Sequence, residues 1–152
     1  MRVYLAGPEV FLPDALDVAA AKKRICAAHG LEGVFPLDTP PQAPPADRPY
    51  WMRIYLGNEA HIRSCAGLIA NLTPFRGPSA DAGTVYELGF MRALGRPVMG
   101  YSNAAADFQL SATGAGIAGG VYQPDRDQLF AIREAIRDDG ATLKRLLTDR
   151  TF

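Results

Sequence analysis

A loop rich in glycine and proline, at residues 74–83, separates an apolar run at 67–72 from a helical pattern at 84–94. The run before the loop is short and almost continuously apolar, which is typical of a strand buried on both faces of a parallel sheet. A strand, a loop and a helix in this order form the unit with which open α/β sheets bind ligands, at the carboxyl ends of their strands. The segment therefore predicts both a fold class and the position of a binding site.

The rest of the chain repeats this alternation of strand and helix. Further strands are predicted at 2–6, 33–36 and 98–101, with a short fifth strand at 121–122, and further helices at 13–29, 49–64 and 125–147, the last broken near Gly140. Such an alternation predicts a mostly parallel sheet with helices on both faces. We expect a single-domain α/β fold over 1–152, a flavodoxin-like or Rossmann-like three-layer sandwich with a five-stranded sheet. Trp51 and Tyr55 follow helical spacing, which predicts that they pack against the core.

The charges of the chain balance, with 16 Lys and Arg against 16 Asp and Glu. A chain without net charge has no global field that attracts nucleic acid or an anionic membrane, so we expect neither as a partner. Cys26 and Cys65 lack the spacing of a metal site, and the apolar start at 1–7 is too short for a signal peptide. We therefore expect a reduced, cytoplasmic protein. Neither a dinucleotide-binding glycine motif after the first strand nor a P-loop lysine is present, which disfavours dinucleotides and nucleoside triphosphates.

Two carboxylates, Asp81 and Glu87, flank the start of the predicted helix at 84–94. Asp81 is placed to accept a hydrogen bond from a backbone N–H of the first turn, and the helix dipole favours the ionised form of Glu87 one turn later. An ionised carboxylate beside a hydroxyl-bearing ligand can act as a general base or attack an anomeric carbon. An alternative stays open, because Thr84-x-x-Glu87 is also a capping-box sequence in which Glu87 only bonds to the backbone.

Three segments together carry a resemblance to a known family. They are Tyr-Leu-Ala-Gly-Pro at 4–8, Ile-Ala-Asn-Leu-Thr-Pro-Phe-Arg-Gly at 69–77 and Asp-Ala-Gly-Thr-Val-Tyr-Glu-Leu-Gly at 81–89. In this combination the chain resembles the nucleoside 2-deoxyribosyltransferase family, over residues 1 to 101. None of the three segments would be specific alone.

The resemblance implies roles for three residues. Glu87 would be the nucleophile that attacks C1′ of the sugar, and the Tyr4 hydroxyl would hold that carboxylate in place. Asp81 would accept a hydrogen bond from the sugar 5′-hydroxyl, and an acid there repels phosphate, so free nucleosides are favoured over 5′-monophosphates. Expected substrate-binding residues are Gly7, Asn58, Asn71, Phe75 and Gly83.

The chain departs from the family pattern at two places. Asn58 stands where some members have an aspartate that protonates the leaving base, so either Glu59 or a water would carry that proton. Asn71, at the end of the predicted third strand, is either a second polar contact or a cap that begins a loop. The segment 107–116 lacks the asparagine that reaches the neighbouring subunit's active site in the family. The resemblance still implies a homodimer or higher homo-oligomer with shared sites.

The resulting hypothesis is an enzyme, without cofactor or metal, that transfers 2-deoxyribosyl groups between a 2′-deoxynucleoside and a free nucleobase. The alternatives are an N-glycosidase that uses water as acceptor, acting on deoxynucleosides or their 5′-monophosphates, and a non-catalytic nucleoside-binding or nucleotide-binding domain. The proline-rich loop at 39–47 is either a cover over the base pocket or a stiff surface connection.

Overall fold

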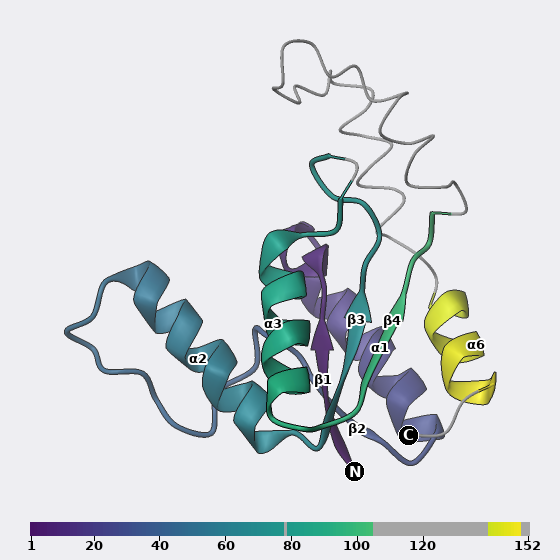
Figure 1. Cartoon of the computed structure of the whole chain (residues 1–152), viewed down its shortest axis with the longest axis horizontal. Coiled ribbons are helices and arrows are strands. Elements are labelled where there is room, and N and C mark those ends of the chain that lie inside the picture. The colour runs from purple at the N-terminus through teal and green to yellow at the C-terminus, as the bar shows by residue number, and fades with distance from the viewer. Residues whose placement is uncertain (78, 105–139, 150–152) are drawn as a thin grey trace.

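Four parallel strands form the sheet in the computed structural model, which describes residues 1–77, 79–104 and 140–149. The strands are β1 (Arg2–Ala6), β2 (Glu32–Val34), β3 (Gly67–Asn71) and β4 (Val98–Tyr101), in the spatial order β2-β1-β3-β4 (Figure 1). This order agrees with the first four strands of the expected flavodoxin-like arrangement. The expected fifth strand at 121–122 lies outside the described residues.

Helices cover both faces of the sheet (Figure 1). Helices α1 (Ala15–Ala28) and α6 (Ala141–Asp149) pack on one face, and α2 (Tyr50–Ser64) and α3 (Ala82–Ala93) on the other, while a short 3-10 helix, η1 (Pro8–Phe11), follows β1. Gly140 has a φ of 80° directly before α6, a left-handed conformation that suits glycine. Residues 125–139 of the predicted helix at 125–147 lie outside the described residues, and α6 begins directly after Gly140.

The alternation of side chains along β1 assigns each residue to one of two cores. Val3 and Leu5 pack with Leu143 and Leu147 on the side of α1 and α6. Tyr4 packs with Ile62 and Met91 on the side of α2 and α3. Full burial of side chains of this size contributes about 1.5–3 kcal/mol each, so a register shift that exchanged the two faces would be costly. The register therefore directs the Tyr4 side chain toward α3.

The prediction that Trp51 and Tyr55 pack against the core is wrong. Their exposed fractions are 65% and 40%, whereas Ile62, near the other end of α2, is fully buried. The physical reason is that the N-terminal half of α2 and the loop before it project away from the sheet, to the left in Figure 1. Helical spacing indicates which residues share a face of a helix, but not whether another element covers that face.

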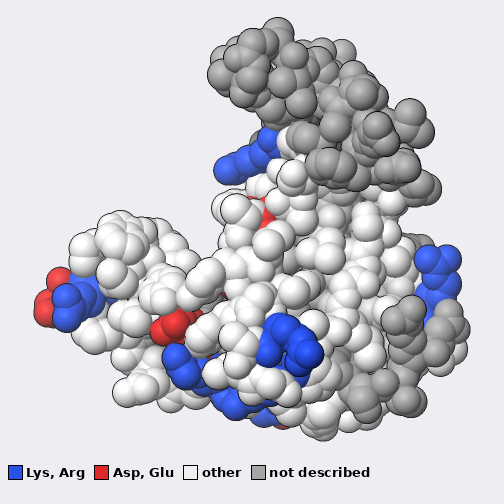
Figure 2. All heavy atoms as spheres, viewed as in Figure 1, with Lys and Arg blue, Asp and Glu red and all other residues white. Residues whose placement is uncertain are grey.

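The surface shows Lys and Arg side chains and Asp and Glu side chains in small, scattered groups on the face drawn in Figure 2. Within the described ranges, no helix is both long enough and apolar enough to cross a bilayer. Cys26 and Cys65 are buried as free thiols, one in each core.

Candidate active site

Side chains from three elements meet at the carboxylate of Glu87. The Tyr4 hydroxyl, from β1, donates a hydrogen bond to Glu87 Oε1 at 2.9 Å. Asn58 Nδ2, from α2, donates to the same oxygen at 3.0 Å. Within the described residues Oε2 of Glu87 accepts no hydrogen bond. The carboxylate is therefore oriented through one oxygen, and the other is available to a ligand.

The capping-box interpretation of Thr84 and Glu87 is wrong. Asp81 is the N-cap of α3, and its Oδ2 accepts hydrogen bonds from the backbone N–H of Thr84 at 2.9 Å and from its hydroxyl at 3.1 Å. Gly83 allows this approach, because a Cβ there would lie 3.1 Å from the same Oδ2 atom. The helix is capped without Glu87, whose carboxylate bonds to Tyr4 and Asn58 instead.

Burial raises the pKa of Glu87 to about 7. The hydrogen bond from Tyr4 opposes this shift, the charge of Asp81 adds to it, and the hydrogen bond from Asn58 opposes it. Only 7% of the residue is exposed, so desolvation outweighs the helix dipole, whose effect falls off after the first turn. Burial, followed by the charge of Glu87, raises the pKa of Tyr4 well above its usual value, so Tyr4 stays a hydrogen-bond donor. At neutral pH the Glu87 carboxylate is therefore partly ionised and can also accept a proton, while Tyr4 stays protonated.

A cavity of about 610 Å³ opens in front of Glu87. This volume lies in the range of small-molecule sites. Five of the residues predicted for the site line it, namely Gly7, Asn58, Asp81, Gly83 and Glu87. Tyr4 lies behind Glu87, fully buried, and reaches it through its hydroxyl. Together these residues form a concave site with a carboxylate at its floor.

Two residues predicted to contact substrate lie outside the cavity lining. Asn71 Nδ2 donates to Glu9 Oε1 at 2.9 Å, and its Oδ1 accepts from the backbone N–H of Thr73 at 3.0 Å. Phe75 stacks on Phe11 with ring centroids 5.1 Å apart, and Phe11 lines the cavity. Phe75 thus supports a wall residue, and Asn71 belongs to a buried network on the other side of the sheet.

That network is built around an ion pair that the sequence analysis missed. Lys22 Nζ donates to Glu9 Oε1 at 2.5 Å, and both residues are less than 5% exposed. Burial opposes the charged form of Lys22, but Tyr101 and Glu9 hold its pKa above the usual value. Gly7 is required next to this pair, because a Cβ at that position would lie 1.9 Å from Glu9 Oε2. The only sequence feature that pointed to this ion pair was Glu9, a carboxylate directly after the Gly7-Pro8 turn.

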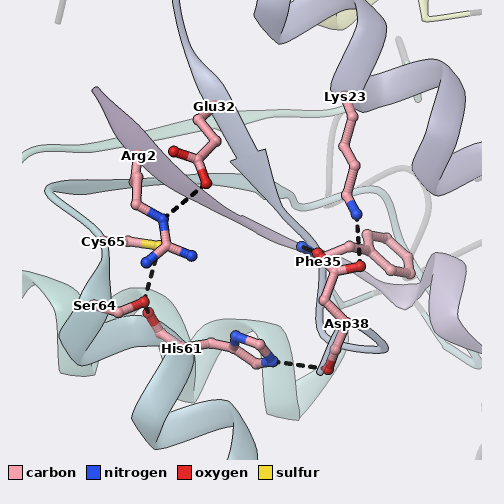
Figure 3. Close-up of polar contacts among 8 residues, drawn as sticks. All are labelled: Arg2, Lys23, Glu32, Phe35, Asp38, His61, Ser64 and Cys65. Atoms are coloured by element: carbon pink, nitrogen blue, oxygen red, sulfur yellow. Dashed lines mark hydrogen bonds and ion pairs between the residues drawn. The ribbon is translucent and has the colours of Figure 1, made fainter. Parts of the chain in front are cut away.

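The proline-rich loop begins at a cluster of polar contacts centred on Asp38 (Figure 3). Its Oδ1 accepts from Lys23 Nζ at 2.5 Å, its Oδ2 from the backbone N–H of Phe35 at 2.9 Å, and its carbonyl oxygen lies 3.1 Å from His61 Nε2. A carbonyl only accepts, so Nε2 carries the proton of the His61 ring. Burial lowers the pKa of His61, which keeps the ring neutral.

This cluster attaches the loop to α1 and α2, and the loop supplies one wall of the cavity. Pro40 and Pro44 line the cavity opposite Gly57 of α2, where a Cβ would lie 3.8 Å from each proline ring. Glu59, the predicted substitute acid, accepts from the Tyr55 hydroxyl at 2.9 Å and is absent from the lining. In the described part of the chain, no three His, Cys, Asp or Glu side chains gather as a metal site would require.

Comparisons with known proteins give a family match and several structural neighbours. The model of the nucleoside 2-deoxyribosyltransferase family matches residues 3–142. Among solved structures, a 2-desoxiribosyltransferase from Leishmania mexicana superposes with a TM-score of 0.64 at 21% identity, over 99% of both chains. A 2-deoxyribosyltransferase from Bacillus psychrosaccharolyticus superposes with a TM-score of 0.55 at 22% identity, over 75% of this chain and 81% of that one.

A sequence relative comes from Schizosaccharomyces pombe and is described as an uncharacterized protein. It is 38% identical over 105 residues, which cover 66% of this chain and 49% of the relative. The chain therefore spans about half the length of the curated relative that it matches. The solved structures, at these identities, show a shared fold.

Proposed function

The chain belongs to the nucleoside 2-deoxyribosyltransferase family, and from this premise we propose that it transfers the 2-deoxyribosyl group of a 2′-deoxynucleoside to a second nucleobase through an ester on Glu87. The observation that carries the proposal is the state of the Glu87 carboxylate. One oxygen is held by Tyr4 and Asn58 at 2.9 Å and 3.0 Å, and the residue lines a cavity large enough for a nucleoside.

In the first step Glu87 Oε2 attacks C1′ of the sugar. The C1′–O bond forms as the C1′–N bond breaks, and the electron pair of that bond leaves with the base. Positive charge develops at C1′, and the adjacent carboxylate stabilises it. The Tyr4 hydroxyl fixes the direction of attack through Oε1. We assign the proton on the leaving base to a water, because Asn58 has no acidic proton and Glu59 bonds to Tyr55 instead of lining the cavity.

Asp81 orients the sugar in this proposal. Its Oδ2 is used by the helix cap, and Oδ1 is left to accept a hydrogen bond from the 5′-hydroxyl. A 5′-phosphate at this position would meet a carboxylate, so free nucleosides are preferred over nucleotides. In the second step a ring nitrogen of the incoming base attacks C1′ on the face that the first base left. The ester bond then breaks and Glu87 is restored, so the configuration at C1′ is retained.

Incubation with 2′-deoxyinosine and adenine, followed by chromatography, tests this proposal. We expect 2′-deoxyadenosine and hypoxanthine from the unmodified protein, and a rate lower by about a hundredfold or more in Glu87→Ala, because the nucleophile is lost. Glu59→Ala, which removes a carboxylate outside the cavity lining, is the matched control and should keep the rate. Free 2-deoxyribose without a new nucleoside would instead identify an N-glycosidase, and an intact substrate would identify a binding domain.

We also propose a homodimer or larger homo-oligomer. The support comes from the exposed aromatic side chains of α2 and α3, among them Trp51, Tyr55 and Tyr86. Sedimentation velocity on the unmodified protein would show a mass of at least two chains, and a monomer at all concentrations would contradict it.

A further inference from the structure

Arg53 is a cation that lines the cavity and has no partner in the described part of the chain. It lies on α2, one turn before Gly57. Within the described residues its guanidinium makes no hydrogen bond and no ion pair. Asp38, the acid directly before the proline-rich loop, also lines the cavity but is already paired with Lys23. The donors of Arg53 are therefore available to a ligand.

The position of Arg53 assigns it to the base of a bound nucleoside, an assignment that rests on the proposed function. Glu87 and Asn58 meet where α2 and α3 approach each other. Toward their N-termini the two helices diverge (Figure 1). Asp81 at the start of α3 and Arg53 on α2 both line the cavity, and each comes from a different one of these helices. A sugar with C1′ at Glu87 and its 5′-hydroxyl at Asp81 directs its base toward the wall formed by α2 and the proline-rich loop.

That wall has a chemistry that selects among bases. Pro36, Pro40 and Pro44 offer apolar rings and have no backbone N–H. Arg53 offers only donors, arranged as a planar fork that matches two neighbouring acceptors. Hypoxanthine and guanine present such a pair, O6 and N7, whereas adenine presents N7 beside the N6 amino donor and pyrimidines have no N7.

We propose that Arg53 determines base specificity and selects 6-oxopurines, so that 2′-deoxyinosine and 2′-deoxyguanosine are preferred over 2′-deoxyadenosine. A bidentate contact of this kind discriminates between bases by roughly ten- to hundredfold. Arg53→Leu removes both donors, and Arg53→Lys keeps the charge but loses the fork, so only part of the preference returns. Arg48→Leu is the matched control, because Arg48 is an exposed loop residue outside the cavity lining.

Two measurements test the proposal. The first is single-turnover release of base from 2′-deoxyinosine and from 2′-deoxyadenosine, with enzyme in excess and no acceptor. We expect Arg53→Leu to lower the ratio of the two rates by about tenfold or more, mainly through 2′-deoxyinosine, and Arg48→Leu to leave it unchanged. The second is equilibrium dialysis with hypoxanthine and adenine, where Arg53→Leu should weaken the binding of hypoxanthine selectively.

The outcomes separate this proposal from the proposed function. Equal losses for both nucleosides, which would leave the ratio of the two rates unchanged, would overturn the base-reading role of Arg53. If the unmodified protein cleaves neither nucleoside, the proposed function fails. The dialysis experiment then decides by itself whether Arg53 selects 6-oxopurines. A preference for hypoxanthine that Arg53→Leu abolishes would then support the site, and equal binding of the two bases would overturn it.

Discussion

Replacement of Glu87 by glutamine changes how the stability of the protein depends on pH. Glutamine has nearly the same shape and can bond to Tyr4, but it has no proton to lose. In the unmodified protein, burial raises the pKa of Glu87 from 4.5 to about 7. Between these two values the folded chain binds more protons at this residue than the unfolded chain does, so stability decreases as pH rises.

The size of the effect follows from the same two values. The rise in the pKa of Glu87 from 4.5 to about 7 corresponds to roughly 3 kcal/mol of stability that is fully present below pH 4.5 and lost as pH rises through 7. From about pH 5 to about pH 8.5, Glu87→Gln should therefore gain roughly 2–3 kcal/mol of stability relative to the unmodified protein. Titrating groups that do not interact with Glu87 cancel in this difference.

Urea unfolding at a series of pH values, followed by circular dichroism, measures this difference. Trp51 is 65% exposed, so tryptophan fluorescence would be a poor probe of the core. Glu59→Gln is the matched control, because its carboxylate bonds to Tyr55 on the exposed side of α2 and burial cannot produce the same trend. A difference between Glu87→Gln and the unmodified protein that stays constant with pH would refute the reasoning that burial dominates at this site.

Three further predictions concern the groups around Glu87 and beneath the cavity. Tyr4→Phe removes a hydrogen bond that lowers the pKa of Glu87, so the acid limb of the pH profile of kcat/KM should move up by about one unit or more, and an unmoved limb would contradict this role. Asp81→Ala should cost about 1 kcal/mol in urea unfolding through loss of the helix cap, and Asp81→Asn should restore most of it. Lys22→Met leaves the Glu9 charge buried without its ion-pair partner and should cost about 3–5 kcal/mol, whereas a loss below about 1 kcal/mol would show that the pair is not buried in solution.

Much of the fold was predictable because local patterns determine it. The continuous apolar run of β1 and the left-handed glycine after α1 both mark element boundaries that the structure confirms. The exposure of Trp51 was not predictable from its spacing, because whether a helical face is covered depends on the direction in which α2 leaves the sheet.

Five of the residues predicted for the site line one cavity, but their arrangement around it was not predictable from the sequence. Spacing alone could not distinguish a capping role for Glu87 from a role in the site. The contact that excludes the capping role comes from Tyr4, 83 positions away in the sequence. The alternation of β3 explains the placement of Asn71. It shares a face with Ile69, which packs on the side of α1 and α6, whereas the cavity lies on the side of α2 and α3. Arg53 belongs to no motif that the sequence reveals, and it lines the cavity only because of the direction of α2.

The most direct test of the central claim is the mass of the protein during turnover. The protein is mixed with 2′-deoxyinosine without an acceptor base, quenched with acid and analysed by mass spectrometry. We expect an added mass of one 2-deoxyribosyl group that peptide mapping locates at Glu87 and that is absent from Glu87→Gln. Release of hypoxanthine without any adduct, or an adduct at another residue, would contradict the assignment of Glu87 as the nucleophile.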